Sequence, residues 1–507
     1  MKGKKFSSLL LAALCLVGCG AQKPAEPEKV LTMHMHFFGY CVYDENWPIF
    51  QKASEITGVK IKGTASKSVV DSSQAWAAML ASKPLPDIVH GERHYCEEFT
   101  ENGGYIPLDD LIEKYAPNIK KFFEECPEAK IMGSGTDGHI YWIPGSVSGT
   151  EKAVMPSKGW FIRTDWLRKL ELSAPTTVDE LYNVLKAFKT EDPNGNGKAD
   201  EIPYFNRQEG IIDLYQLFGA YHNWHEDENG RLVYGKSEES FRNAVREVAK
   251  WCKEGLIDPE IYTRGQDTRE YLLSKNLGGM THDWFSSTSK FAEMKEIPGF
   301  GWDVILPPAD TNGVVKEMSS RSILHSCGWG ISIDCKDPEL AIKYLDFWLS
   351  DEGRMLNAYG VEGVHYKLVD GKPQFTEQVL SAEEGVPNYM RNQGSVEIGT
   401  IGTIEAEISG MNEIGRRGYE MYDSGGFVQK LFRAPKFTDK ENIVINDKWE
   451  TIKEYCEGME QKWICGVEDV DACWDEYINK LYALGLDEVT EIYNKAYKRE
   501  QDMLKAK

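Results

Sequence analysis

Oxygen-bearing side chains recur at alternate positions in a short segment that begins at residue 192. Asp192, Asn194, Asn196 and Asp200 stand at positions 1, 3, 5 and 9 of this segment, and a glycine stands at position 6. This spacing is typical of the EF-hand calcium loop, in which alternate residues point inward and the glycine permits a sharp turn. The chemistry it predicts is the coordination of a hard cation by oxygen atoms.

Two further positions would complete this cation site. Lys198 would contribute its backbone carbonyl, as position 7 does in an EF-hand. The twelfth position, where an EF-hand carries a bidentate glutamate, is Pro203, so Glu201 must close the shell if the loop 192–203 binds Ca²⁺. The alternative is a solvated Asn-Gly turn between a helix and a strand. Because all the ligands are local in sequence, we expect a structural calcium ion.

The sequence lacks the short motifs of common catalytic sites. It contains no Gly-x-Ser-x-Gly elbow, no His-Glu-x-x-His and no Walker phosphate loop. The 80 acidic residues could still supply the two carboxylates of a glycosidase. A secreted, calcium-containing polysaccharide-active enzyme is therefore the alternative function, and we predict a protein that is not an enzyme.

The N-terminus resembles a secretory signal that ends in a lipid attachment site. Three lysines precede an apolar run over residues 9–17, which is too short to span a bilayer. Leu16-Val17-Gly18-Cys19 resembles the bacterial lipobox, in which the cysteine is acylated, with palmitate among the attached chains, and becomes the mature N-terminus. We predict a signal peptide over 1–18 and a flexible linker over 19–28. An ordinary cleaved signal peptide with an accidental cysteine is the alternative.

The predicted anchor implies a location. No other stretch is long and apolar enough to cross a membrane, so the rest of the chain is expected on the extracytoplasmic face of the cell membrane, held through Cys19.

Composition narrows the class of partner. The formal charge is -22, and loss of residues 1–18 would remove three lysines and no acids, leaving -25. This excess argues against nucleic acid or anionic lipid, which bind clustered lysine and arginine. The 14 Trp and 24 Tyr favour a ligand with flat apolar faces edged by polar groups.

Cysteine usage indicates neither a metal site nor a disulfide framework. Nine cysteines remain beyond the signal peptide and Cys19, an odd number, and none forms a C-x-x-C pair. We expect most of them to be buried small apolar residues, with a structural disulfide as the alternative.

The hydrophobic pattern alternates strands with helices, which predicts α/β lobes with largely parallel sheets. At 507 residues the chain exceeds the usual size of one core, so two lobes are expected. The link 145–159 is the predicted first crossing between them. Strands are predicted over 29–35, 59–62, 85–90, 140–144, 160–163, 277–284, 302–306 and 326–333, and helices over 47–57, 72–81, 109–115, 177–189, 240–255, 338–350, 470–484 and 489–504.

Short stretches spread along nearly the whole chain carry a family resemblance. Beside the lipobox they are residues 47–50, 85–88, 104–109, 137–141, 163–167, 192–203, 359–363 and 484–486. In this order they resemble the long carbohydrate-binding extracellular solute-binding proteins (family 1) of bacterial ABC importers, especially the lipoprotein branch related to alginate-binding proteins. The resemblance implies a two-lobed periplasmic-binding-protein-like fold of type II with a helical C-terminal region. It also implies calcium at Asp192, Asn194, Asn196, Lys198, Asp200 and Glu201.

On this resemblance the lobes can be assigned. The N-terminal lobe is expected to comprise 29–145 and 318–352, and the C-terminal lobe 146–317 and 353–507. The solute would lie in the cleft between them.

Within such a fold the cleft lies beyond the carboxyl ends of the strands. Glu92 and Arg93 follow one predicted strand and resemble the acidic-arginine pair that grips sugar hydroxyls in relatives. Asp283 and Trp284 follow another, where relatives often carry a tryptophan that stacks on sugar. Arg207, Trp224, Trp329 and Tyr366 are further candidates, although aromatic residues are more often part of the core.

The resemblance implies the substrate-binding component of an ABC transporter. It would capture an oligosaccharide by hinge closure and deliver it to the transmembrane subunits of a permease, with ATP hydrolysis on separate subunits. A monomer is expected, and no nucleic acid partner. Neutral oligosaccharides, uronate-bearing oligosaccharides and peptides all remain open as solutes.

Overall fold

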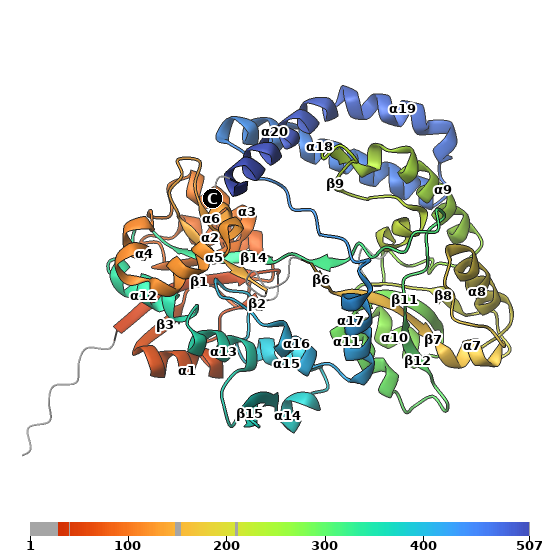
Figure 1. Ribbon diagram of the computed structural model, residues 1–507, viewed down its shortest axis with the longest axis horizontal. Helices are drawn as coiled ribbons and strands as arrows, with labels where there is room; N and C mark the ends of the chain where they lie inside the picture. The colour runs from red at the N-terminus through yellow and green to blue at the C-terminus, as the bar shows by residue number, and fades with distance from the viewer. Residues whose placement is uncertain (1–28, 40, 148–153, 208–210, 506–507) are drawn as a thin grey trace, which may run out of the picture.

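The chain folds into two α/β lobes joined by several crossing segments (Figure 1). The computed structural model describes residues 29–39, 41–147, 154–207 and 211–505. The predicted signal peptide, Cys19 and the predicted linker lie outside the described residues. None of the described helices combines the length and the apolar composition that a bilayer span requires.

The first lobe is built on a six-stranded sheet with the order β2-β1-β4-β14-β5, and β3 pairs with β1. Strands β1, β3 and β4 run parallel, whereas β14 is antiparallel to both β4 and β5. The strands are β1 Lys29–Phe37, β2 Cys41–Val42, β3 Val59–Gly63, β4 Ile88–Glu92, β5 Trp142–Ser146 and β14 Leu324–Ile331.

Local signals define the helices of the first lobe. A proline opens α1, and Gly58, with φ of 68°, ends it in the left-handed conformation. Asp71 caps α2 by accepting a hydrogen bond from the Gln74 amide. The elements are α1 Pro48–Thr57, α2 Ser72–Ala81, α3 Arg93–Glu101, α4 Asp109–Tyr115, α5 Pro117–Glu125, α6 Pro127–Gly133, α12 Pro338–Phe347, α13 Asp351–Tyr359, β15 Tyr366–Val369, β16 Lys372–Phe375, α14 Glu377–Leu380 and α15 Val386–Asn392.

The second lobe is built on a four-stranded sheet with the order β12-β7-β11-β8. Strands β8 and β11 are parallel, and β7 is antiparallel to β11 and β12. The elements are β7 Lys158–Arg163, α7 Thr164–Lys169, α8 Val178–Thr190, β8 Ile202–Tyr204, the 3₁₀ helix η1 Ile212–Phe218, β9 Trp224–Glu226, β10 Leu232–Tyr234, η2 Gly235–Ser237, α9 Glu239–Lys253, α10 Thr268–Ser274, β11 Gly278–Trp284, α11 Phe285–Thr288, η3 Ser289–Glu293, β12 Trp302–Ile305, α16 Ile404–Ser409 and α17 Glu413–Gly425.

Both sheets are mixed, so the prediction of largely parallel sheets was wrong. The reason lies in the crossings between the lobes. The chain leaves the first lobe through β5 and re-enters it through β14, so these neighbouring strands must run in opposite directions. Two short strands, β6 Met155–Pro156 and β13 Ser320–Arg321, pair antiparallel within the crossings.

Each lobe has its own hydrophobic core. The predicted division differs from the packing in one segment, because residues 356–401 join the first core and not the second. Helix α13 packs against α1 of the first lobe, and Tyr359, Tyr366 and Phe375 are buried there. The chain passes to the second core at α16, where Ile404 belongs to the second core and Ala406 to the first.

The C-terminal region consists of the helices α18 Asp439–Ile464, α19 Val470–Ala483 and α20 Leu486–Lys505. All three are drawn in blue in Figure 1, where they arch from the second lobe toward the first. Helices α18 and α19 pack on α9 of the second lobe, and α20 also reaches α6 of the first lobe. A capping box formed by Thr438 and Glu441 starts α18.

Among the described residues the nine cysteines are free thiols, and five of them are buried. Burial raises the pKa of Cys96 to about 12, which keeps this thiol protonated. It packs as a small apolar residue.

A buried ion pair fastens α18 to the second lobe. The Lys236 ammonium lies 2.6 Å from a Glu460 carboxylate oxygen, and the Tyr215 hydroxyl donates to the other oxygen at 2.6 Å. All three side chains are buried. Loss of Glu460 would leave the lysine charge without a partner in the core.

We therefore predict that Glu460→Ala lowers the free energy of unfolding by about 3–5 kcal/mol. The measurement is urea unfolding followed by tryptophan fluorescence. Glu457→Ala, at an exposed position on the same helix, is the control and should change stability little. Equal stability of both variants would contradict the prediction.

Candidate functional site

The carboxyl ends of β8 and β11 bring Arg207 and Asp283 together. Because these strands are parallel neighbours, the residues that follow them meet at one edge of the sheet. Arg207 donates to Asp283 from Nε at 2.8 Å and from a terminal nitrogen at 2.6 Å. This bidentate pair unites two residues that the sequence placed in the site separately.

A second arginine explains why Asp283 remains charged although it is 2% exposed. Arg269, from α10, lies 3.2 Å from the carboxylate. Burial alone would raise the pKa of Asp283, but Arg269 and Arg207 outweigh it and hold the pKa below its usual value. The anion orients the Arg207 guanidinium, whose remaining terminal nitrogen donates to Gln266 at 3.0 Å.

Trp284, the last residue of β11, lies half-buried against a crossing segment. The guanidinium carbon of Arg321, on β13, lies 4.9 Å from the centre of the Trp284 ring, which is a cation–π contact. Arg321 also donates to Glu407 of α16 at 2.6 Å, while its buried Nε has no hydrogen-bond partner among the described residues. Lys158 is the cross-strand neighbour of Trp284 on β7.

Arg321 also lines a cavity of about 410 Å³ between the lobes. Its walls come from the first lobe at Glu128, from the crossings at Met318 and Gln429, and from the second lobe at Tyr221. Polar and aromatic groups from both lobes can therefore meet one ligand here. Arg321 was missed in the sequence because its place over Trp284 depends on the path of the crossing.

The first-lobe candidates Glu92 and Arg93 are neighbours in sequence but do not form a pair. Glu92 accepts a hydrogen bond from the Phe38 amide at 3.0 Å, which ties the ends of β1 and β4 together. Arg93 donates to Glu97 at 2.8 Å and to the Ala434 carbonyl at 3.2 Å. The predicted acidic-arginine pair is thus replaced by Arg93 and Glu97, one helical turn apart.

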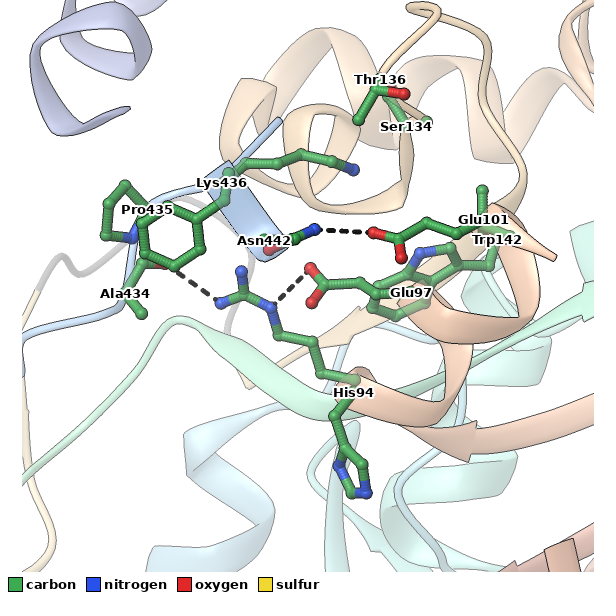
Figure 2. Close-up of a pocket in the computed structure, with 14 residues that line it drawn as sticks. His94, Glu97, Glu101, Ser134, Thr136, Trp142, Ala434, Pro435, Lys436 and Asn442 are labelled. Carbon is green, nitrogen blue, oxygen red and sulfur yellow. Dashed lines mark hydrogen bonds and ion pairs between the residues drawn. The ribbon is translucent and has the colours of Figure 1, made fainter. Parts of the chain in front are cut away.

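Arg93 lines a smaller cavity of about 340 Å³ between α3 and the segment that precedes α18 (Figure 2). Asn442 of α18 donates to Glu101 of α3 across this junction at 2.7 Å. Burial, together with the nearby Arg93 and Arg433, lowers the pKa of Lys436 to about 8. The junction is polar and joins the first lobe to the C-terminal helices.

Three aromatic candidates are core residues, and the prediction that they contact solute conflicts with their burial. Trp329 is 0% exposed within β14. Tyr366 is buried beside Tyr359 in the first core. Trp224 borders the larger cavity, but its ring is stacked on Tyr493 at 4.1 Å and is 2% exposed. None offers a free ring face.

The predicted cation loop connects α8 to β8 and has the turns that its glycines predict. Gly195 and Gly197 have φ of 74° and 75°. The Asp192 carboxylate faces the inside of the loop, where it accepts from the amides of Asn196 at 3.0 Å and Gly197 at 3.1 Å. The Asn196 side-chain amide donates to Asp200 at 2.9 Å.

Glu201 is the informative residue of this loop. It is 1% exposed, and no cationic side chain of the described residues pairs with its carboxylate. Burial raises its pKa and Asp192 and Asp200 add to the effect, although the backbone amides of Glu201 and Asn194 oppose it. A buried carboxylate without a countercharge is costly, and a bound cation would satisfy it. The donor set therefore fits a hard, oxygen-liganded ion.

The loop does not contain the usual acidic cluster of a metal site. The described part of the chain holds no group of three or more His, Cys, Asp and Glu residues placed to bind a metal. A cation in this loop would need the asparagine oxygens and the Lys198 carbonyl as well as the carboxylates.

Comparison with known proteins gives consistent matches. The family model described as bacterial extracellular solute-binding protein matches residues 42–355. A fructooligosaccharide ABC transporter substrate-binding protein, FusA of Streptococcus pneumoniae, is 26% identical over 574 residues, covering 99% of each chain. Lipoprotein LipO of Bacillus subtilis is 25% identical over 391 residues, covering 73% of this chain and 74% of LipO.

Solved structures agree on the fold. The crystal structure of alginate-binding protein AlgQ2 without calcium ion superposes with a TM-score of 0.83 and 36% identity, covering 93% of this chain and 98% of AlgQ2. An S. pneumoniae FusA structure described as an EF-hand mutant has a TM-score of 0.74 at 23% identity and covers 94% of this chain and 100% of FusA.

The match over residues 42–355 spans more than half of the chain, and the similarity to AlgQ2 extends over nearly all of it. The expected two-lobed fold is confirmed by these neighbours. The chain belongs to the bacterial extracellular solute-binding protein family and has its two-lobed, periplasmic-binding-protein-like fold.

Proposed function

We propose that this protein is the lipid-anchored substrate-binding component of an ABC transporter, and that it captures an oligosaccharide between its lobes. The observation that carries the proposal is the contact of Trp284 with the guanidinium of Arg321, which itself lines an interlobe cavity. The pair of Arg207 and Asp283 lies at the same end of β11. The relatives FusA and AlgQ2, whose names specify fructooligosaccharide and alginate, support a carbohydrate solute.

The chemistry of these groups suits a sugar. A tryptophan face covers the apolar C–H side of a pyranose or furanose ring, and adjacent donors bind its hydroxyls. Asp283 holds Arg207 in one orientation, so little entropy is lost when its donors meet a ligand. Arg321, which lies over the Trp284 ring, can bind a carboxylate or hydroxyl oxygen of the sugar.

Delivery would follow from closure of the lobes around the solute. The crossings that include β6 and β13 would serve as the hinge, and the closed form would present both lobes to the transmembrane subunits of a permease. ATP hydrolysis would occur on separate subunits. A lipid on Cys19 would keep a monomeric binder near that permease and raise its effective concentration.

We also propose that the loop 192–203 holds a structural Ca²⁺ ion. Asp192, Asn194, Asn196, Asp200 and Glu201 would supply side-chain oxygens, and Lys198 its carbonyl. Bound calcium would supply the positive countercharge for the buried Glu201 carboxylate. The loop leads through β8 to Arg207, so a rigid loop would also steady the binding site.

A panel of oligosaccharides tests the binding function. Isothermal titration calorimetry with fructose-based, alginate-derived and neutral glucose-based oligosaccharides should give one site of defined stoichiometry, and chromatography should recover the ligand unchanged. A cleaved product would instead favour the alternative of a polysaccharide-active enzyme.

Trp284→Ala should weaken binding of the best ligand roughly tenfold or more, which is about 1.4 kcal/mol, because the stacking face is lost. Tyr482→Ala is the matched control, since Tyr482 is an exposed aromatic residue on α19. Calorimetry should show no change for this control. Unaltered affinity in Trp284→Ala would remove Trp284 from the site.

Calcium binding is tested by thermal unfolding. Calcium at about 100 times its dissociation constant should stabilise the wild-type protein by about 2.7 kcal/mol. Glu201→Gln should lose most of this gain, because it removes the buried charge. Glu191→Gln, an exposed acid beside the loop, should keep it. A calcium response that is equal in both variants would rule out Glu201 as a ligand.

The anchor is tested in cells. Cys19→Ser should move the protein from the membrane fraction to the medium or periplasm, since no acyl chain can be attached. Immunoblots of the fractions measure the shift. Continued membrane association of the variant would show that Cys19 is not the anchor.

A further inference from the structure

A histidine of β11, in the second-lobe sheet, is fully buried between two carboxylates. His282 lies with Nδ1 2.9 Å from an Asp213 oxygen and with Nε2 3.0 Å from a Glu317 oxygen. All three side chains are buried. Nε2 is hydrogen-bonded to Glu317, whereas Nδ1 and Asp213 form a close contact that lacks the alignment of a hydrogen bond. A doubly protonated imidazole is the form that places a positive charge between the two carboxylates.

The surrounding charges keep this histidine protonated. Burial alone would lower the pKa of His282, but Glu317 and Asp213 raise it to about 9. Burial would also raise the pKa of Asp213, but His282 and Lys158 lower it to about 2. At neutral pH the three residues form a buried anion–cation–anion triad.

The triad joins the second-lobe sheet to two of the chain segments that cross between the lobes. Asp213 lies in η1 and His282 in β11, whereas Glu317 lies in the crossing segment just before β13. The Glu317 amide donates to the Phe427 carbonyl at 3.1 Å, and the Glu317 carbonyl accepts from the Gln429 amide at 2.8 Å. The Glu317 backbone therefore joins the two crossings, and its side chain connects them to His282 on β11.

His282 on β11 and Glu317 on the crossing also lie close in sequence to the residues of the candidate site. His282 precedes Trp284 by two positions, so both side chains lie on one face of β11. Glu317 precedes Arg321 by four positions on the crossing, and Arg321 lies over Trp284. The contact between Arg321 and Trp284 and the contact between His282 and Glu317 therefore connect the same two elements, β11 and the crossing.

We propose that the Asp213–His282–Glu317 triad is a positioning device that fixes the crossing segment relative to Trp284 and thereby sets the affinity of the cleft for its solute. This inference rests on the proposed role of Trp284 in solute binding. His282 is a positioning residue, since it lies beneath the site and is itself buried.

Other titratable groups around the triad are few, and each belongs to a neighbouring element. Lys158 of β7 lies 3.4 Å from Asp213, and the Trp160 ring lies 4.6 Å from the His282 ring. The further groups are His222, whose charge acts on Asp213, and the buried hydroxyls of Tyr204 and Tyr422, on which Asp213 and Glu317 act. Among these described neighbours, Lys158 is the group that carries positive charge at alkaline pH.

Loss of the proton would loosen the crossing. Neutral imidazole no longer compensates the two buried carboxylates, so the pair would carry two negative charges against one lysine. The folded-state pKa lies above the ordinary value of 6.5. The contribution of the triad is therefore complete below about pH 6.5 and is lost as the pH rises through about 9.

The experiment measures solute affinity by calorimetry at pH 7 and pH 10. Wild-type affinity should fall at least about fivefold, the lower end of usual coupling between sites. His282→Gln should be weaker at pH 7 and show little further loss at pH 10. Glu317→Gln should bind the solute with less pH dependence than wild type. The double variant H282Q/E317Q should recover part of the loss, because the unpaired buried charge is removed.

Two controls separate the triad from other titrations. His90→Gln changes a buried histidine of the first lobe, where burial lowers the pKa to about 4, so it should keep the wild-type pH response. Lys436→Met removes the lysine with a pKa of about 8 at the other junction and should also keep it. A pH response that survives in H282Q and vanishes in K436M would overturn the proposal.

Two ligand-free measurements keep the proposal independent of the solute. The His282 ring signal in NMR should titrate near pH 9 in the wild type and at lower pH in Glu317→Gln. Hydrogen exchange of residues 314–321 should accelerate in His282→Gln, or in Glu317→Gln if the first variant does not fold. If no oligosaccharide binds the wild type, the proposed function fails, while these two results still decide the role of the triad. Unchanged hydrogen exchange of residues 314–321 in both variants would overturn the proposed role of the triad.

Discussion

A charge that leaves water must find a partner inside the protein, and this fold buries several charges in the second lobe, next to the crossings. Asp283 is neutralised by Arg207 and Arg269, and His282 by Asp213 and Glu317. Each set links elements that are distant in sequence. The net stability of a protein of this kind is small, so an unpaired member of either set would cost a large share of it. The pairing of Glu317 with His282 therefore helps to set the position of the crossing segment relative to the second-lobe sheet.

The same constraint separates the two proposals about bound species. Glu201 is buried and the residues around it carry oxygen ligands, so the proposed compensation there is a cation. In the cleft, by contrast, the guanidinium groups of Arg207 and Arg321 are already held by carboxylates, so a neutral or an acidic sugar could bind without leaving either uncompensated.

Local sequence signals were sufficient for most elements. The helices at Ser72–Ala81 and Asp109–Tyr115 have the predicted bounds, because a capping aspartate, a proline or the hydrophobic period marks their ends. Local sequence does not determine the direction of a strand within a sheet. Strand β14 is antiparallel to β4 only because the chain returns from the other lobe. Asp283 was predicted from a strand end and Arg207 from its place in a loop, but their pairing was not predicted. Arg321 and His282 had no such signal, and Trp329 and Tyr366 were misassigned because a sequence pattern does not show which ring faces are covered.

The C-terminal helices touch both lobes, which changes the kind of motion available to the molecule. The crossings join the lobes on one side, and Asn442–Glu101 and Arg93–Ala434 join them again through the segment around α18. A body held at two places cannot simply swing open at one of them. The second set of contacts includes hydrogen bonds from Asn442 to Glu101, from Arg93 to the Ala434 carbonyl and from Lys436 to carbonyls of α6, and helix α20 also packs on α6. Closure of the lobes would therefore require these polar contacts to rearrange while the crossings bend.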